Sequence, residues 1–408
     1  MTLTRYINLG NIRQVLTSKY WLILTLFGAF FSFFALNRGG IDLFLELSII
    51  FLLVNLLTGN YPIRKIPTSL VVSGFICAYL LLTSILVAPH QSNIRWMFYL
   101  LRMIGAVFAI HCLSQKSDIK RNMITSSAVV LSLAVCWQFV ARNFLGSPNG
   151  TFTNLHYLAT FSALSLPIAF YFFQTFDRWY KWLLMPVGLM DIELLLRTGS
   201  RPAILGLAFS IILVSALFIK GNRKWFCILS FLVVLTILLL TNYANVSGRF
   251  QELIVNLPKE ERVQFWNQTW DKLNQNSVQE WLFGHGISYI PTIYKSGSRM
   301  TPFVFPHIVF LELLYLNGII GFSMVSGGFL ILGTKLIQKG KRLRDRGNGL
   351  FFTCMLVVFL TWLVHCGATV PIYSKYSQYP LAFILGTLIA VLTNGQNKVG
   401  TVARIEKT

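Results

Sequence analysis

Long apolar runs separated by short polar connections dominate the chain. Runs of roughly 18 mostly uncharged residues are long enough to cross a hydrocarbon core of about 30 Å. The pattern predicts twelve membrane-spanning helices: Tyr20–Leu36, Leu43–Thr58, Ser69–Val87, Met97–Leu113, Asn122–Phe144, Leu155–Phe176, Trp179–Leu196, Pro202–Phe218, Trp225–Thr241, His307–Thr334, Gly349–Thr369 and Pro380–Thr393. The expected fold is therefore an all-α polytopic membrane protein with about 12 transmembrane helices.

One long polar stretch, Asn242–Pro306, interrupts this pattern between the ninth and tenth apolar runs. Within it, Pro258–Leu273 predicts a surface helix, because a proline and two glutamates at its start suit a first helical turn. Arg262, Trp266 and Trp270 repeat every four residues and so share one face. We expect the tryptophans to lie towards the bilayer interface.

The same pattern divides the chain into three regions. Residues 1–198 form the first seven transmembrane helices, residues 199–394 form a second region that contains the loop 242–306, and residues 395–408 form a tail.

Composition supports a membrane protein and excludes a water-soluble domain of this length. Apolar residues make up 55% of the chain, charged residues 12%, and the mean hydropathy is +0.62. The six cysteines all lie in apolar segments without metal-ligand spacing. Neither a disulfide framework nor a zinc site is implied, and no cofactor is expected.

The distribution of basic residues predicts the orientation. With the N-terminus in the cytoplasm, 22 of the 35 Lys and Arg residues fall in inside segments and 5 in short outside loops. Both termini are then cytoplasmic and the long polar loop is extracytoplasmic. The basic run that begins at Lys335 suits contact with anionic membrane lipids, and we expect no binding of nucleic acid.

Three polar residues near the outer boundary are candidates for chemistry. Arg201 begins the eighth apolar run, Arg262 lies in the long loop and His307 lies at its far edge, with Arg249 as a further cation. Guanidinium groups match phosphate oxygens, and a boundary histidine can take a proton from a hydroxyl. Together they indicate a transferase with a phosphate or diphosphate leaving group. The alternatives are an interfacial anchor role for Arg262, a snorkelling Arg201 and a His307 bonded to a backbone carbonyl.

Three segments resemble the bacterial O-antigen ligase and O-antigen polymerase superfamily of glycosyltransferases. They are TGSRPAIL around Arg201, ERVQFWNQTW followed by LFGHG, and PHIVFLELLYLNGIIG from Pro306. The resemblance implies that Arg201, Arg262 and His307 are catalytic. It also implies a group of substrate-binding residues: Arg249, Trp266, Gly284, Gly286, Gly318 and Gly321.

The resemblance further implies a metal-independent enzyme in the bacterial inner membrane with a periplasmic active site. The donor would be a glycan on undecaprenyl diphosphate, and the acceptor a sugar of lipid A core, another glycan or a protein serine. The spacing from His307 to Gly318 and Gly321 favours a ligase, with a polymerase that uses the same donor as the alternative. Ile308 stands where the ligase signature has Asn, Ser or Gln, which bears on the ligase reading alone.

Two alternative functions, from other classes of protein, also agree with the sequence. A polysaccharide transporter or flippase would also have about twelve spans, although no internal repeat is visible here. A non-catalytic member that binds polysaccharide is the other. Four charged residues in apolar runs, Arg102, Asp191, Glu193 and Glu312, need partners that the sequence does not identify.

Overall fold

A computed structural model describes most of the central part of the chain. The described residues are 68–87, 117–150, 154–175, 179–218, 261–286, 294–296, 299–301, 308–343 and 349–369, with single positions at 50, 101, 104, 105, 107, 221, 225, 228, 229, 232, 236, 381, 385 and 388. Five predicted spans lie wholly or mainly outside these ranges: Tyr20–Leu36, Leu43–Thr58, Met97–Leu113, Trp225–Thr241 and Pro380–Thr393.

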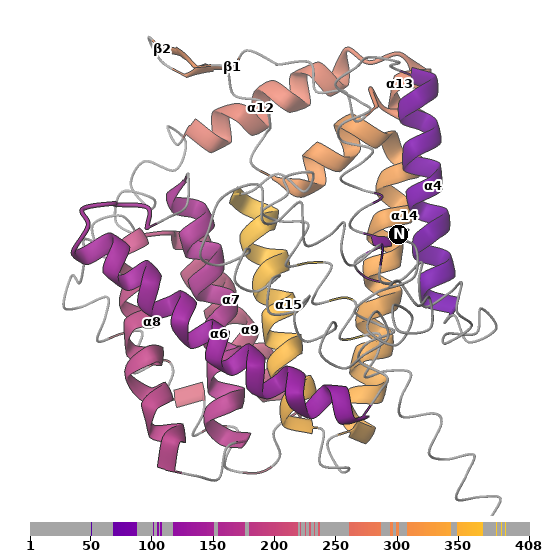
Figure 1. Ribbon diagram of the computed structural model, residues 1–408. Coiled ribbons are helices and arrows are strands. Elements are labelled where there is room, and N and C mark those ends of the chain that lie inside the picture. Colours follow the sequence, from indigo (N-terminus) through magenta and orange to yellow (C-terminus); the bar gives the residue numbers. More distant parts are fainter. Residues whose placement is uncertain are drawn as a thin grey trace, which may run out of the picture.

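The described elements are helices and one short hairpin (Figure 1). They are α4 (Thr68–Val87), α6 (Ser117–Asn143), α7 (Leu155–Thr175), the 3-10 helix η3 (Trp179–Leu183), α8 (Leu184–Thr198), α9 (Arg201–Phe218), α12 (Glu261–Asn274), α13 (Val278–Phe283), β1 (Tyr294–Ser296), β2 (Arg299–Thr301), α14 (Val309–Leu343) and α15 (Gly349–Thr369). The strands pair antiparallel, with Lys295 opposite Met300.

The seven predicted spans that fall on described residues are all helical, with ends that differ by a few residues. Among the described helices, four are long and apolar enough to cross a membrane: α7, α9, α14 and α15. The largest difference is in α14, which continues to Leu343 and contains a break at Gly318. The predicted seventh span begins as the 3-10 turn η3 before α8.

Antiparallel packing brings one end of several helices together. The side chain of His365 near the end of α15 contacts Thr160 near the start of α7, and Phe218 at the end of α9 packs on Phe352 near the start of α15. The start of α7, the end of α8, the start of α9 and the end of α15 therefore share one end of the bundle. We call this the capped end, because α12 lies over part of it, with α13 next to the neighbouring end of α14 (Figure 1).

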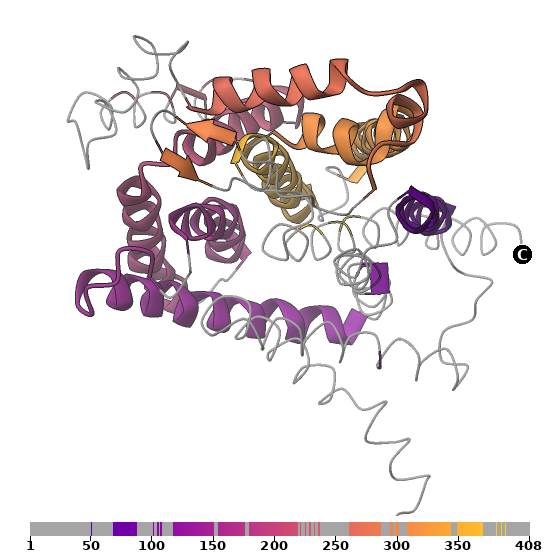
Figure 2. The same ribbon diagram turned by 90° about the horizontal axis from the view of Figure 1, so that it is seen from above.

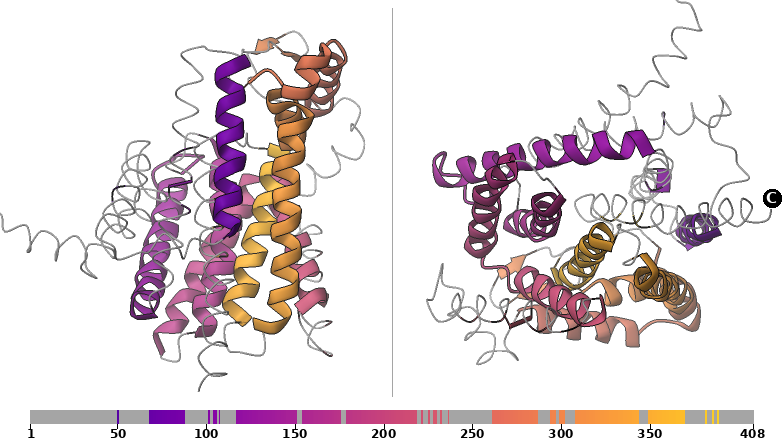
Figure 3. Two further views of the ribbon diagram at one scale, coloured as in Figure 1. Left: turned by 90° about the vertical axis from the view of Figure 1, so that its right-hand side faces the viewer. Right: turned by 90° about the horizontal axis from the view of Figure 1, so that it is seen from below.

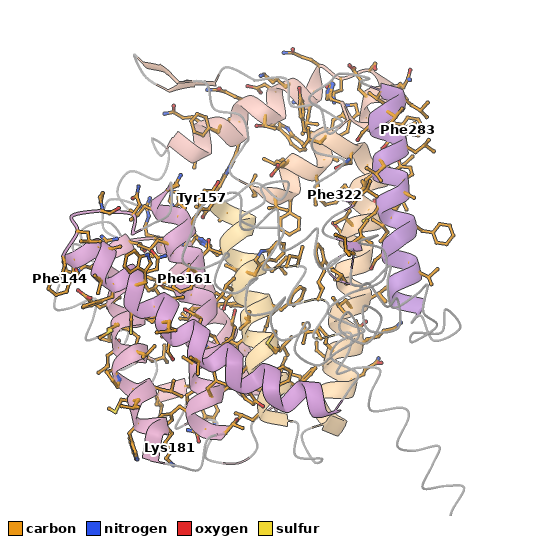
Figure 4. All side chains as sticks on the ribbon, viewed as in Figure 1. Phe144, Tyr157, Phe161, Lys181, Phe283 and Phe322 are labelled. Atoms are coloured by element: carbon orange, nitrogen blue, oxygen red, sulfur yellow. The ribbon has the colours of Figure 1, made fainter. Side chains whose placement is uncertain are left out.

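The labelled side chains show which residues lie at each end of the bundle. Tyr157 lies towards the capped end and Lys181 at the opposite end (Figure 4). The predicted orientation assigns Lys181 to the inside, so we expect the capped end to face outwards. On the other side of the bundle, α4 and α14 run side by side (Figure 3), with Leu80 near Gly321 and Ile76 near Gly328.

The core lies where α7, α8, α9 and α15 meet. Small side chains let these helices approach closely, as in many membrane proteins: Ala159, Ala163 and Ala203 are buried in this cluster. At Gly206 helices α9 and α15 approach closely, since a Cβ there would lie 3.3 Å from the Thr361 carbonyl oxygen. The contact fixes α9 against α15.

Two of the charged residues in apolar runs have partners in the structure. Asp191 of α8 is buried and hydrogen-bonded to Ser165 of α7. Glu193 pairs with Arg197 at 2.5 Å and accepts a hydrogen bond of 3.3 Å from Asn143. Glu312 is buried on α14, and Arg102 lies outside the described residues.

Enlarging Gly206 should disturb this packing. In Gly206→Leu the new side chain must separate α9 from α15, and overpacking of this kind costs about 1–3 kcal/mol. We expect a lower Tm for the protein in detergent. Gly188→Leu on α8 is the control, because a Cβ there meets nothing within 4 Å. Equal melting temperatures for the two variants would contradict the close approach at Gly206.

Candidate functional site

The polar loop contributes helices α12 and α13, and a local cap fixes the start of α13. Helix α13 begins with a capping box: the Ser277 hydroxyl accepts from the Glu280 backbone N–H, and the Glu280 carboxylate accepts from the Ser277 N–H at 2.7 Å. This arrangement uses two otherwise unsatisfied N–H groups. The capping box therefore fixes where α13 begins after the turn from α12.

Helix α12 is amphipathic, and its buried face differs from the row of residues that the sequence pattern picked out. Phe265, Thr269 and Leu273 are almost completely buried, while Trp270 is 48% exposed. Seen from above, α12 lies across the capped end beside the first part of α14 (Figure 2). Trp270 instead meets Trp281 of α13 edge-on, with 6.5 Å between ring centroids.

Helix α14 is interrupted at Gly318. This residue has φ 63° and ψ −174°, a conformation that is open essentially to glycine alone. In an unbroken helix the carbonyl groups of Tyr315 and Leu316 would accept from residues 319 and 320. The first part of α14 therefore runs at an angle to the second (Figure 1).

The turn after α13 supplies donors at this break. The N–H of His285 donates to the Tyr315 carbonyl at 3.1 Å, and the N–H of Gly286 donates to the Leu316 carbonyl at 2.8 Å. Backbone carbonyls in an apolar setting need such partners, because an unsatisfied polar group costs several kcal/mol there. The break and the turn thus form one backbone contact, which we call the α14 junction.

Glycine is required on both sides of the α14 junction. A Cβ on Gly318 would lie 2.6 Å from the backbone nitrogen of Gly284, and a Cβ on Gly284 would lie 2.5 Å from that of Gly318. Gly284 and Gly286 also have positive φ, at 74° and 78°. At Gly321, one turn later, a Cβ would come within 2.5 Å of the Asn317 Cβ.

His285 adds side-chain contacts to the same junction. Its Nε2 lies 3.0 Å from the Asn276 side-chain oxygen, its Nδ1 lies 3.7 Å from Glu280, and its ring centroid lies 4.4 Å from that of Tyr315. Burial lowers the pKa of His285, and the Glu280 carboxylate opposes this shift in part. We call the turn 284–286 docked when it makes these contacts with α14. His285 is therefore more readily neutral in the docked state than when the turn is detached.

Arg201 lies at the capped end on a different element. Gly199 ends α8 in the left-handed conformation, with φ 58°, and its N–H donates to the Leu196 carbonyl at 2.9 Å. Ser200 follows, and its carbonyl accepts from Ala203, so α9 begins at Arg201. The proline at the next position needs no N–H there. Arg201 is partly exposed and occupies the first turn of α9.

The predicted site residues are therefore distributed over several elements. Gly284, Gly286 and Gly318 meet at the α14 junction, and Gly321 lies one turn beyond it. Arg262 lies in the first turn of α12, and its side chain is outside the described part of the structure, whereas Trp266 is partly buried on the same helix.

His307 and Arg249 both lie outside the described residues. The chain becomes described again at Ile308, directly before α14. The catalytic and substrate-binding roles of these residues remain predictions.

One group of polar residues at the capped end was not anticipated from the sequence. His365 of α15 lies with Nε2 2.8 Å from the Thr160 hydroxyl of α7. The available signal was a repeat in an otherwise apolar helix, with Thr361, His365 and Thr369 spaced by four residues.

A comparison with known protein families finds a match over part of these elements. Residues 187–326 match the O-antigen ligase family model. The match covers about a third of the 408 residues, from within α8 to beyond the break in α14, and confirms there the resemblance to the O-antigen ligase and polymerase superfamily. No curated protein matched the chain.

The matched O-antigen ligase segment includes the arginines at positions 201 and 262 and the whole α14 junction. With several apolar helices, it supports a multi-pass membrane protein. Helix α15, with His365, lies beyond the match.

Replacing Gly318 by alanine should loosen the α14 junction. Alanine in this backbone conformation costs about 1–3 kcal/mol, and its Cβ would also press on the turn before Gly284. We expect faster hydrogen exchange over residues 276–286 by mass spectrometry. Gly327→Ala in the same helix is the control, since its Cβ meets nothing within 4 Å. Unchanged exchange in Gly318→Ala would argue against the junction.

Acid should also loosen the junction through His285. Its pKa lies below the ordinary value of 6.5 in the docked state. Docking is therefore fully stable above pH 6.5 and weakens as the pH falls from there through the lowered pKa, because the undocked form takes up the proton more readily. Exchange over residues 276–286, corrected for its intrinsic pH dependence, should rise between pH 7.5 and pH 5.5. His285→Gln should remove this rise, and a rise that persists in it would assign the effect to another group.

Proposed function

We propose that this chain is a membrane glycosyltransferase of the O-antigen ligase type. It transfers a glycan from undecaprenyl diphosphate to a sugar hydroxyl of lipid A core, without a metal ion, at the periplasmic face of the inner membrane. The family match over residues 187–326 supports an activity of ligase or polymerase type. The donor, the acceptor and the roles of individual residues are parts of the proposal.

The observation that carries the proposal is the position of the two arginines. Arg201 is in the first turn of α9 and Arg262 in the first turn of α12. A helix start carries a partial positive charge, so a cation placed there is unfavourable by itself, by about 0.3–1 kcal/mol. A bound anion reverses this balance, because it attracts both the guanidinium and the helix N–H groups.

The anion that suits this arrangement is the diphosphate of the donor. In the proposed reaction Arg201 and Arg262, with Arg249, bind the diphosphate and stabilise the charge that grows as it leaves. Trp266 on α12 and the glycines of the α14 junction shape the binding surface. Because the junction ties α12 and α13 to α14, it sets where Arg262 stands relative to the membrane helices.

His307 would act on the acceptor. It takes the proton of the acceptor hydroxyl as that oxygen attacks the anomeric carbon of the donor sugar. The new bond forms between this oxygen and the anomeric carbon, and the bond from that carbon to the phosphate oxygen breaks with its electrons on undecaprenyl diphosphate. In-line attack inverts the configuration at the anomeric carbon.

The surface lipopolysaccharide ladder of a deletion strain tests the proposal. Without this chain we expect bare core together with accumulated undecaprenyl-linked polymer, and the wild-type gene should restore the ladder. His307→Ala and Arg262→Ala should fail to restore it, with a loss of about 100-fold or more for a missing acid–base group or charge-stabilising donor. Gel electrophoresis of lipopolysaccharide gives the readout.

Membrane expression of each variant must match the wild type, and Gly327→Ala serves as a control with an ordinary ladder. A core that carries a single repeat would identify a polymerase instead. Near-normal ladders in a well-expressed Arg262→Ala strain would refute the role of Arg262. An unchanged ladder in the deletion strain would refute ligation to lipid A core.

A further inference from the structure

Helix α15 carries a row of buried polar side chains. Thr361, His365 and Thr369 are spaced by four residues, lie on one face and are all at most 2% exposed. The rest of the helix is almost entirely apolar. Polar groups inside a membrane domain are costly and commonly mark functional positions.

Hydrogen bonding fixes the proton on His365. The Thr160 hydroxyl donates to the His156 carbonyl at 2.8 Å, so its oxygen is left to accept from the imidazole. Nε2 of His365 lies 2.8 Å from that oxygen and 3.4 Å from the same carbonyl, and both neighbours are acceptors. The hydrogen-bond pattern therefore assigns a proton to Nε2. With this proton, Nε2 of His365 donates to the Thr160 hydroxyl oxygen, and the Thr160 hydroxyl donates in turn to the His156 carbonyl.

The hydrogen-bonded pair of His365 and Thr160 lies at the capped end, among the elements of the candidate site. His156 is in the first turn of α7, where its N–H donates to the Asn154 side chain at 2.9 Å. Gly206 holds α9 against α15 beside Thr361, one turn from His365, and the same helix begins at Arg201. The beginning of α14 lies beside the end of α15 in both Figure 1 and Figure 2.

Stability alone gives little reason for this pair. A buried hydrogen bond contributes about 0.5–1.5 kcal/mol, and well-packed apolar side chains would hold the two helices as firmly. What a hydrogen bond adds is direction, because it permits one registration of α15 on α7. That registration sets the height of the end of α15 relative to the starts of α7 and α9.

We propose that His365 is a positioning residue of the transfer site, acting through its Nε2–H on Thr160 to register α15 against α7. The inference rests on the proposed glycan transfer. It concerns a residue beyond the segment that matches the O-antigen ligase family.

Four variants test the role of His365 in purified full-length protein with a lipid-linked donor. His365→Leu and Thr160→Val each remove the hydrogen bond and should lower kcat about tenfold, with KM for the donor within about threefold of wild type. The double variant should lose no more than either single one, because the two residues act as a unit. His365→Gln keeps an N–H donor near Nε2 and should recover kcat to within about threefold.

Thr353→Val is the matched control, since this threonine of α15 donates to the Gly349 carbonyl of its own helix at 2.7 Å. It should transfer normally. Thr160→Val keeps the side-chain volume and carries the test if His365→Leu does not fold. Additive losses, no recovery in His365→Gln, or a fall in kcat that follows the fall in Tm would overturn the positioning role.

The two proposals fail in different ways. If wild type and Thr353→Val transfer glycan, Arg262→Ala does not, and His365→Leu transfers normally, only the role of His365 is wrong. If wild type transfers no glycan to any acceptor, the transfer function and the inference built on it both fail.

Discussion

The organisation of the capped end depends on two carbonyl groups. The break at Gly318 removes the partners that Tyr315 and Leu316 would have in a continuous helix, and the backbone of His285 and Gly286 replaces them. Because these are backbone contacts at close range, they tolerate no side chain at Gly284 or Gly318. The polar loop is consequently held to the membrane helices at one defined height, and α12 follows from there.

The sequence predicts much of this fold and little of its junction. Apolar periodicity identified every described membrane helix and the surface helix, because both depend on local pattern. The same periodicity continues through Gly318, so a straight and a broken α14 look alike in sequence. Similarly, the sequence pattern placed Arg262, Trp266 and Trp270 on one face of α12 but did not identify the row with Phe265 and Leu273 that packs against the protein. Which face is buried depends on the partner helix, and the sequence of α12 alone does not contain that partner.

The histidines show the same division between local and tertiary information. His307 attracts notice because it lies where a polar loop meets an apolar run. His365 lies inside an apolar run, where a lone histidine is usually a satisfied core residue, and only the neighbouring threonines at spacings of four hint at more. Its link to Thr160 joins residues 205 positions apart and is visible only in the folded chain.

Charge placement connects these local features with the chemistry. Basic residues are fewer on the predicted outer side than on the inner side, yet Arg201 and Arg262 both begin helices, where the backbone already carries positive charge. A cation at a helix start is favourable where an anion offsets this repulsion. The α14 junction holds the helix that bears Arg262, and the contact of α9 with α15 at Gly206 holds the one that bears Arg201. The proposed diphosphate site relies on both helix starts being held by these contacts, because preorganisation is the main way in which fixed charges lower a transition-state barrier.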